Sequence, residues 1–169
     1  IFVLWIESFE MDNTYEVTED LGILNIGKHM VLSIGNVMTV VMRPGVGKSN
    51  LCEAIIAGGI NSEVDALGFT VNLRGRGVLF IDTERTKNDL GKGYRRIVTR
   101  ARAYSEPKVM NEKGLEKVKV YSYRVLDSAD KYIKHLEGHL KTGDYSLVLL
   151  DQAADFLSSV NNETEAMKF

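Results

Sequence analysis

The chain of 169 residues has little cysteine and little proline: one cysteine, Cys52, and two prolines, Pro44 and Pro107. A single cysteine excludes an internal disulfide framework. Such a composition is typical of proteins in a reducing compartment, so we expect the protein to be cytoplasmic. Both prolines fall where turns are expected.

Long apolar runs are also missing. The opening IFVLWI is followed by Glu7, and these six residues are far fewer than the about 20 that span a bilayer. The same stretch lacks a basic segment and a small-residue cleavage site. We therefore expect neither a signal peptide nor a membrane partner.

Neither sign of charge dominates the chain, whose formal net charge is −2. Any attraction to nucleic acid must therefore be local. The segment 87–102 is the local candidate, with one acid, Asp89, and six basic residues, Lys87, Lys92, Arg95, Arg96, Arg100 and Arg102. These side chains either contact DNA phosphates or a neighbouring subunit, or form a solvated helix face.

The apolar pattern predicts alternating strands and helices in about one domain. The expected strands are 37–42, 77–82, 118–123 and 146–151, and the expected helices are 49–60, 87–104 and 128–143. The strand candidates are nearly continuous apolar runs, which suits a sheet covered on both faces. We therefore predict an α/β fold, a three-layer sandwich with a mostly parallel sheet.

The segment RPGVGKS lies between a predicted strand and a predicted helix, the context of a phosphate-binding loop. Gly45 and Gly47 let the backbone turn its N–H groups toward phosphate oxygens, and Lys48 reaches the β- and γ-phosphates. The nucleotide-binding candidates are Arg43, Pro44, Gly45, Val46, Gly47, Lys48, Ser49 and Asn50. The sequence departs from the motif G-x-x-x-x-G-K-[ST] at Met42, where a glycine is usual. A side chain at this position need not enter the cradle, but it could weaken phosphate binding.

Asp151 ends the apolar run LVLLD, which has the form of a Walker B segment. A carboxylate at the tip of a buried strand holds Mg²⁺, usually through a water. We therefore predict a Mg²⁺ site formed by Ser49 and Asp151.

The run VLFIDTER ends in two acids, Asp82 and Glu84. A carboxylate beside the Walker B strand polarises the water that attacks the γ-phosphate, and Glu84 is the candidate base, with Lys48 as its catalytic partner. Asp82 has an alternative role, since Asp82 and Thr83 are well placed to cap the following helix.

These three segments together resemble RecA-like ATPases, most closely the ATPase domains of plasmid and mobile-element replicative helicases. The resemblance rests on RPGVGKS, on the strand ending in D-T-E, and on LVLLD followed by QAADF, and it covers about residues 20–169. It implies a partial RecA-like ATP-binding domain at 21–169 after an N-terminal extension at 1–20. Gln152 stands where a small residue is common in such proteins.

The resemblance also implies what lies further along such a domain. The strand after Walker B would lie between the Walker B strand and the phosphate-loop strand, and it would follow Phe169, as would the arginine finger and the DNA-binding loops. The chain is therefore expected to end within its domain.

The expected function is Mg²⁺-dependent ATP binding and hydrolysis, coupled to DNA unwinding or remodelling in a homo-oligomeric ring or filament. DNA would be contacted through the downstream loops or the helix 87–102. One alternative is a nucleotide-binding module without turnover, and another is a small-molecule kinase. A GTPase is disfavoured because DALG at 65–68 lacks a preceding strand and no N-K-x-D motif is present.

Overall fold

The computed structural model describes residues 2–3, 22–103 and 112–156. Its strands are β1 (Phe2–Val3), β2 (Gly22–Ile26), β3 (His29–Ser33), β4 (Met38–Thr39), β5 (Phe69–Val71), β6 (Gly77–Asp82), β7 (Val118–Ser122) and β8 (Tyr145–Asp151). Its helices are α1 (Lys48–Ile60), α2 (Lys87–Arg102), α3 (Glu112–Glu116) and α4 (Ala129–Thr142), with a 3-10 turn, η1, at Ala153–Phe156. Of the expected extension 1–20, only Phe2–Val3 belongs to the described residues.

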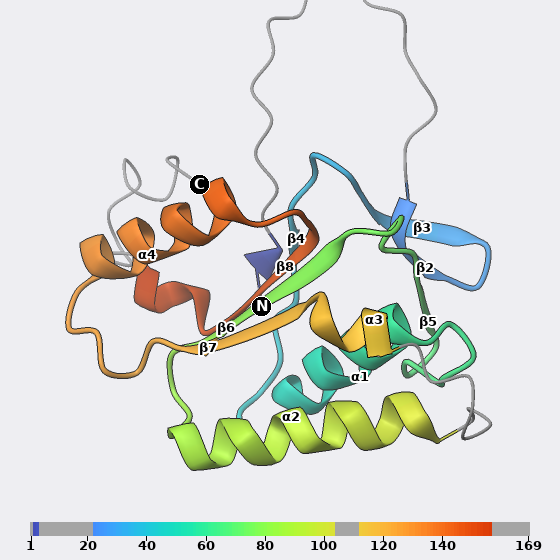
Figure 1. Cartoon of the computed structure of the whole chain (residues 1–169), viewed down its shortest axis with the longest axis horizontal. Coiled ribbons are helices and arrows are strands. Elements are labelled where there is room, and N and C mark those ends of the chain that lie inside the picture. Colours follow the sequence, from blue (N-terminus) through green and yellow to red (C-terminus); the bar gives the residue numbers. More distant parts are fainter. Residues whose placement is uncertain (1, 4–21, 104–111, 157–169) are drawn as a thin grey trace, which may run out of the picture.

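Three parallel strands form the centre of the molecule. β6 pairs in parallel with β7 on one side and with β8 on the other. The crossover from β6 to β7 contains α2, and the crossover from β7 to β8 contains α4, as parallel pairing requires. The predicted α/β class is thus confirmed, with three parallel strands at its centre (Figure 1). The five-stranded sheet as a whole is mixed and not mostly parallel, because β1 pairs antiparallel with both β4 and β8.

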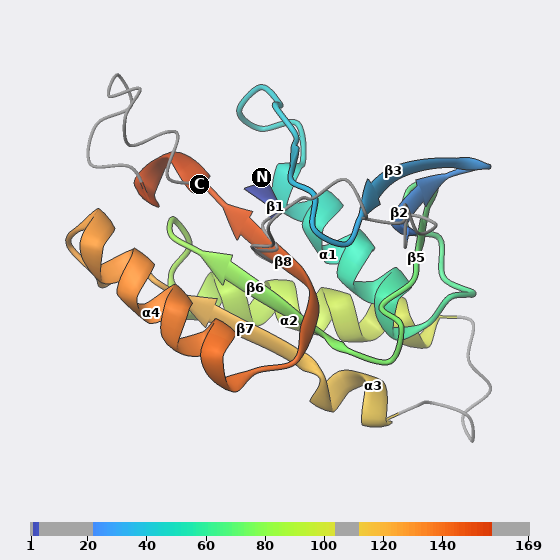
Figure 2. The same ribbon diagram turned by 90° about the horizontal axis from the view of Figure 1, so that it is seen from above.

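Alternate residues of the central strands face two separate cores. Phe80 of β6 and Leu149 of β8 pack with α1 and α2, whereas Ile81 and Leu150 pack with α4 and η1. Figures 1 and 2 show α1 and α2 on one face of these strands and α4 on the other. Both faces are covered, which is why the runs 77–82 and 146–151 are apolar without alternation.

The prediction that 118–123 is buried on both faces is wrong. In β7, Val118 is buried, the alternate residues Val120 and Ser122 are half-buried, and the residues between them are exposed. It forms an edge of the sheet, so it has one strand neighbour and a less covered outer side.

The predicted parallel strand 37–42 is also wrong in length and in pairing. Only Met38–Thr39 is a strand, and it pairs antiparallel with β1. Val41, expected in the core, is 90% exposed. β1 lies between β4 and β8 and is antiparallel to both, so the place that the resemblance reserves for a later strand is taken by residues 2–3.

A second, antiparallel sheet of order β3-β2-β5 was not predicted. β2 and β3 are joined by a two-residue turn in which Gly27 has a φ of 57°, a conformation that favours glycine. Ile23, Leu24 and Leu32 are buried against the core of α1 and α2. The sequence signal for this hairpin is Gly27, which lies between two short apolar runs.

The three longer helices begin and end close to their predicted bounds. α2 begins after Thr86, whose Oγ1 accepts a hydrogen bond from the Asp89 N–H at 3.2 Å. α4 lies between Ser128 and Gly143, as predicted. Among the described residues, no helix combines the length and the apolar character needed to cross a membrane.

α1 and α2 are joined by a buried group of charges. Glu53 of α1, 3% exposed, accepts hydrogen bonds from Arg85 Nη1 at 2.8 Å and from Arg96 Nε and Nη2, both at 2.7 Å. Arg85 Nε also pairs with Asp82 Oδ2 at 2.5 Å. Burial lowers the pKa of Arg85, but its hydrogen bonds to Asp82 and Glu53 outweigh that effect and raise it. The buried carboxylates are thus compensated, as a low-polarity interior requires.

Gly93 allows this close approach of α2. A Cβ atom at position 93 would lie 2.5 Å from Glu53 Oε1 and 2.7 Å from Arg85 Nη1. We expect Gly93→Ala to lower the free energy of unfolding by about 1–3 kcal/mol, because the methyl group displaces the paired charges. A urea titration measures the change.

Gly91→Ala is the matched control on the same helix, since nothing lies within 4 Å of a Cβ there. It should raise the free energy of unfolding by up to about 1 kcal/mol through helix propensity. Equal stabilisation by both substitutions would show that the charged group tolerates a methyl at 93.

Candidate functional site

The segment 40–47 connects β4 to α1, and its later part, 42–47, is the predicted phosphate-binding loop. Gly45 has a φ of 79° and Gly47 a φ of 95°, so both predicted glycines adopt the left-handed conformation. Gly47 precedes the first residue of α1, and its carbonyl oxygen accepts the N–H of Leu51 at 3.0 Å. The first N–H groups of a helix have no acceptor within it, so the start of α1 offers donors to an anion.

The structure brings Lys48 and Ser49 together with Asp151, which lies about a hundred residues later in the chain. Ser49 Oγ donates a hydrogen bond to Asp151 Oδ2 at 2.7 Å, and Lys48 Nζ lies 3.0 Å from Asp151 Oδ1. The Asp151 side chain is 3% exposed. It comes within reach because β8 ends beside the start of α1.

These contacts suit a divalent cation of the Mg²⁺ type. The Ser49 hydroxyl and the Asp151 carboxylate are oxygen donors, the kind that Mg²⁺ prefers. Asp151 Oδ1 has no hydrogen-bond partner of good geometry, although the Lys48 ammonium group is close enough for an ion pair. Among the described residues, no group of three or more His, Cys, Asp and Glu is placed to hold a metal. Phosphate oxygens and water would have to supply the remaining ligands.

A cleft of about 430 Å³ opens at this point. It is lined by Met42, Arg43, Pro44, Gly45, Gly47, Lys48, Ser49, Asn50, Glu84 and Gln152. Val46, also predicted to bind nucleotide, is 56% exposed and is not part of the lining, and Asp151 lies behind Ser49. Met42, which replaces the usual first glycine of the motif, also belongs to the lining of the cleft.

Glu84 reaches the cleft from the turn after β6. Its backbone N–H donates to Asp82 Oδ1 at 3.0 Å, and its carbonyl oxygen accepts from Arg124 Nη1 at 3.0 Å. These two bonds hold the main chain while the exposed side chain faces the cleft. The structure therefore brings Glu84 to the same cavity as Lys48 and Ser49.

Asp82 acts as a backbone cap, the second of its two expected roles, but it caps a turn and not the helix α2. Its Oδ1 accepts the N–H groups of Glu84 and Arg85, so it caps the turn that precedes the helix. The residue that caps α2 itself is Thr86. Thr83 Oγ1 lies 2.5 Å from Asp155 Oδ2 and joins the end of β6 to η1.

Gln152 is the residue of the cleft that the sequence argument missed. Its Oε1 accepts a hydrogen bond from Lys48 Nζ at 2.9 Å. Its φ of 67° is left-handed, which is uncommon for glutamine. The only signal in the sequence was its position directly after Asp151.

Cys52 lies one turn into α1 and is fully buried. Burial, together with the nearby Asp151 charge, raises the pKa of its thiol to about 12. The thiol stays protonated near neutral pH, so Cys52 is a small core residue.

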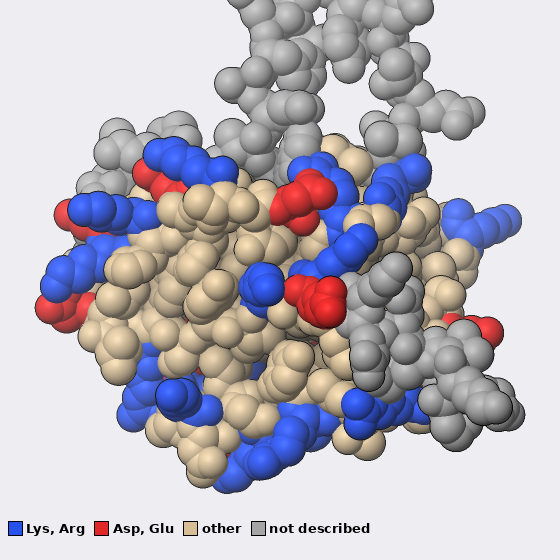
Figure 3. All heavy atoms as spheres, viewed as in Figure 1, with Lys and Arg blue, Asp and Glu red and all other residues tan. Residues whose placement is uncertain are grey.

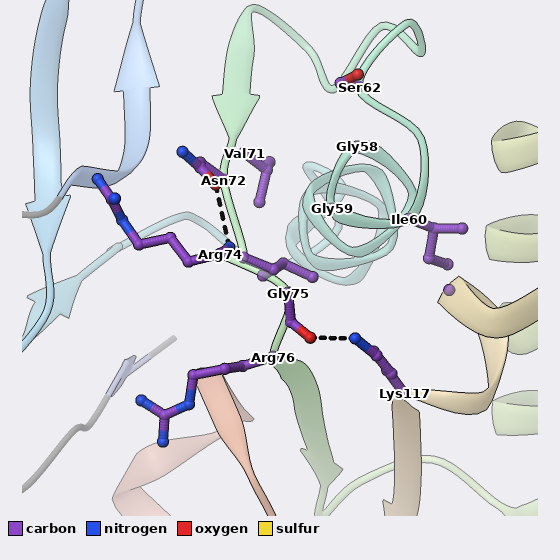
Figure 4. A pocket seen from close by; sticks show the side chains of 12 residues that line it. Gly58, Gly59, Ile60, Ser62, Val71, Asn72, Arg74, Gly75, Arg76 and Lys117 are labelled. Carbon is purple, nitrogen blue, oxygen red and sulfur yellow. Dashed lines mark hydrogen bonds between the residues drawn. The ribbon is translucent and has the colours of Figure 1, made fainter. Parts of the chain in front are cut away.

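A second cleft, of about 390 Å³, lies at the opposite ends of the parallel strands, where β6 and β7 begin. Three of its lining residues are basic, but they do not converge. Arg76 pairs with Asp144, and Lys117 donates to the Gly75 carbonyl. Figure 4 shows the side chains of Arg74 and Arg76 leaving the turn in different directions. This cleft therefore presents no assembled anion site.

The basic residues of α2 gather along one edge of the molecule (Figure 3). Arg96 binds Glu53, Arg100 Nη1 donates to the Asp65 carbonyl at 3.0 Å, and Lys92 pairs with Asp89. At least half of the six side chains thus have partners within the chain. Contact of this helix with DNA phosphates stays a prediction.

Comparison of the chain with protein-family models, with curated proteins and with solved structures finds no match. The cleft is formed by the loop 42–47 and the first residues of α1, with Glu84 and Gln152 on its wall. Asp151 lies behind it, bonded to Ser49.

Proposed function

We propose that the protein binds Mg·ATP in the cleft of the loop 42–50 and hydrolyses it, on a RecA-like three-layer α/β sandwich. The observation that carries this proposal is the contact of Ser49 and Lys48 with the buried Asp151. A chance G-x-G-K-S segment in a surface loop has no reason to place its lysine and serine against a buried carboxylate. A phosphate-binding loop needs that arrangement.

Phosphate recognition follows from the backbone of the loop. Gly45 and Gly47 turn the chain into α1, whose first residues, Lys48, Ser49 and Asn50, line the cleft, so their backbone N–H groups are available to phosphate oxygens. The positive end of the helix dipole adds to the attraction. Lys48 supplies a full positive charge, which in a partly buried site is screened less than at the surface.

Ser49 and Asp151 would hold Mg²⁺. The ion supplies a Lewis acid that neutralises charge on the β- and γ-phosphates when bound. Asp151 is suited to this task because its Oδ1 has no hydrogen-bond partner of good geometry among the described residues and its Oδ2 contacts the hydroxyl of Ser49. Its position is fixed by β8, which is hydrogen-bonded to β6 along its length.

Glu84 would accept a proton from the attacking water. A general base must face the space where the water lies, and Glu84 shares the cleft with Lys48 and Ser49. Its backbone bonds to Asp82 and Arg124 limit where the carboxylate can go. Such positioning accounts for much of the rate in phosphoryl transfer.

Coupling of hydrolysis to DNA unwinding or remodelling, and assembly into a ring or filament, rest on the resemblance to RecA-like ATPases. One observation favours a different outcome, a module that binds nucleotide without turnover. Met42 lines the cleft where phosphate-binding loops usually have glycine, so its side chain narrows the space for the phosphates.

Lys48→Ala should weaken Mg·ATP binding by about 30-fold or more, because it removes the charge partner of the phosphates. Isothermal titration calorimetry measures the dissociation constant. Lys92→Ala is the control, since this lysine is exposed and paired on α2. Unchanged affinity in the Lys48 variant would contradict the phosphate-loop assignment.

Glu84→Gln should lower phosphate release by about 10²–10⁴-fold while leaving ATP affinity nearly unchanged, because the amide cannot accept the proton of the water. A coupled phosphate assay reports turnover. Glu63→Gln, at an exposed site away from the cleft, should behave like the parent chain. Full turnover in the Glu84 variant would mean that another group positions the water.

Titration of the parent chain and of Met42→Gly with ATP and GTP, each with Mg²⁺, tests the proposal as a whole. We expect ATP binding in both proteins and tighter binding in the glycine variant, because the cleft is wider there. Binding in Met42→Gly alone would identify a site closed by Met42. No binding in either protein would overturn the proposed function.

A further inference from the structure

Gln152 is held in its unusual backbone conformation by the structure around it. It directly follows β8, and the next residues form η1, of which Ala153 and Phe156 are buried in the core beneath α4. Its carbonyl oxygen accepts the N–H of Asp155 at 3.1 Å, and Asp155 contacts Thr83. The chain on both sides is therefore fixed, and the left-handed residue between them turns its side chain back toward α1.

The ammonium group of Lys48 lies between two acceptors. Asp151 Oδ1 is 3.0 Å away and Gln152 Oε1 is 2.9 Å away. The two acceptors differ in position, since Gln152 lines the cleft and Asp151 lies behind it. A ligand that enters the cleft and needs an N–H of Lys48 therefore meets the amide first.

We propose that Gln152 is a positioning residue that competes with the nucleotide phosphates for Lys48. This inference rests on the proposed function. In the empty cleft the amide oxygen and Asp151 Oδ1 occupy two of the three N–H donors of the ammonium group, and on binding a phosphate oxygen displaces the amide. Asp151 stays in place through Ser49, so the exchange involves the amide alone. The Gln152–Lys48 bond thus lowers nucleotide affinity and holds Lys48 ready at the mouth of the cleft.

Gln152→Gly isolates this contact. Glycine adopts a φ of 67° without strain, so the substitution removes the amide and leaves the backbone free to keep its course. We expect Mg·ATP to bind about 10-fold more tightly to this variant, the effect of losing a competing hydrogen bond to a charged group. Calorimetry on the whole chain measures it.

Two further variants serve as controls. Gln152→Asn keeps an amide and tolerates the left-handed conformation but is one methylene shorter, so it should also bind Mg·ATP more tightly. Gln152→Glu gives Lys48 a charged competitor and should weaken binding. If Gln152 only supported the fold, the three variants would lower the melting temperature. They would not then show tighter Mg·ATP binding for the glycine and asparagine variants and weaker binding for the glutamate variant.

The contact with Lys48 is tested separately in the empty protein. Limited acetylation at pH 8, read by mass spectrometry, should modify Lys48 faster in Gln152→Gly than in the parent chain, because the amine has lost an acceptor. Equal rates would overturn the contact. Equal or weaker Mg·ATP binding by Gln152→Gly, with the parent chain binding, would overturn the competition alone. Failure of the parent chain to bind any nucleotide would overturn the proposed function, and the competition with it.

Discussion

The arrangement of the cleft depends on the buried carboxylate of Asp151. A carboxylate that is nearly excluded from water is stable only if nearby groups compensate its charge. Ser49 and Lys48 do so from the first turn of α1, which ties that helix to the end of β8. The same contacts hold the loop 42–47 near the carboxyl end of β8 and set the position of the cleft.

A second group of charges fixes the side of α1 that faces α2. Glu53 receives both Arg85 and Arg96, and Arg85 also holds Asp82 at the end of β6. Breaking a buried pair from one side leaves an uncompensated charge, so these contacts resist movement of one helix against the other. Glu84 lies between Asp82 and Arg85 in the sequence. The network therefore holds the turn that carries Glu84 to the cleft.

Both charge groups lie at the ends of parallel strands, and this is a consequence of topology. β6 and β8 are parallel and in register, so that Asp82 and Asp151 are direct neighbours across the sheet. Parallel strands bring their carboxyl ends to one edge, where the following turns meet the start of a helix. The cleft at the opposite edge lacks this convergence, and its basic side chains spread away from each other (Figure 4).

Local features of the cleft were predictable from the sequence. Gly45 and Gly47 adopt positive φ without strain, and the apolar runs of β6 and β8 indicate strands covered on both faces. These predictions hold because each depends on residues close together in the chain.

Tertiary structure alone decided the rest. The placing of β1 between β4 and β8, the edge position of β7, and the contacts of Gln152 with Lys48 and of Arg85 with Glu53 join residues far apart in the sequence. Such contacts depend on strand order and register, which no short stretch of sequence encodes. For the same reason the apolar run 37–42 predicts a buried strand that the structure does not form: its apolar character is local, but its neighbour in the sheet is not.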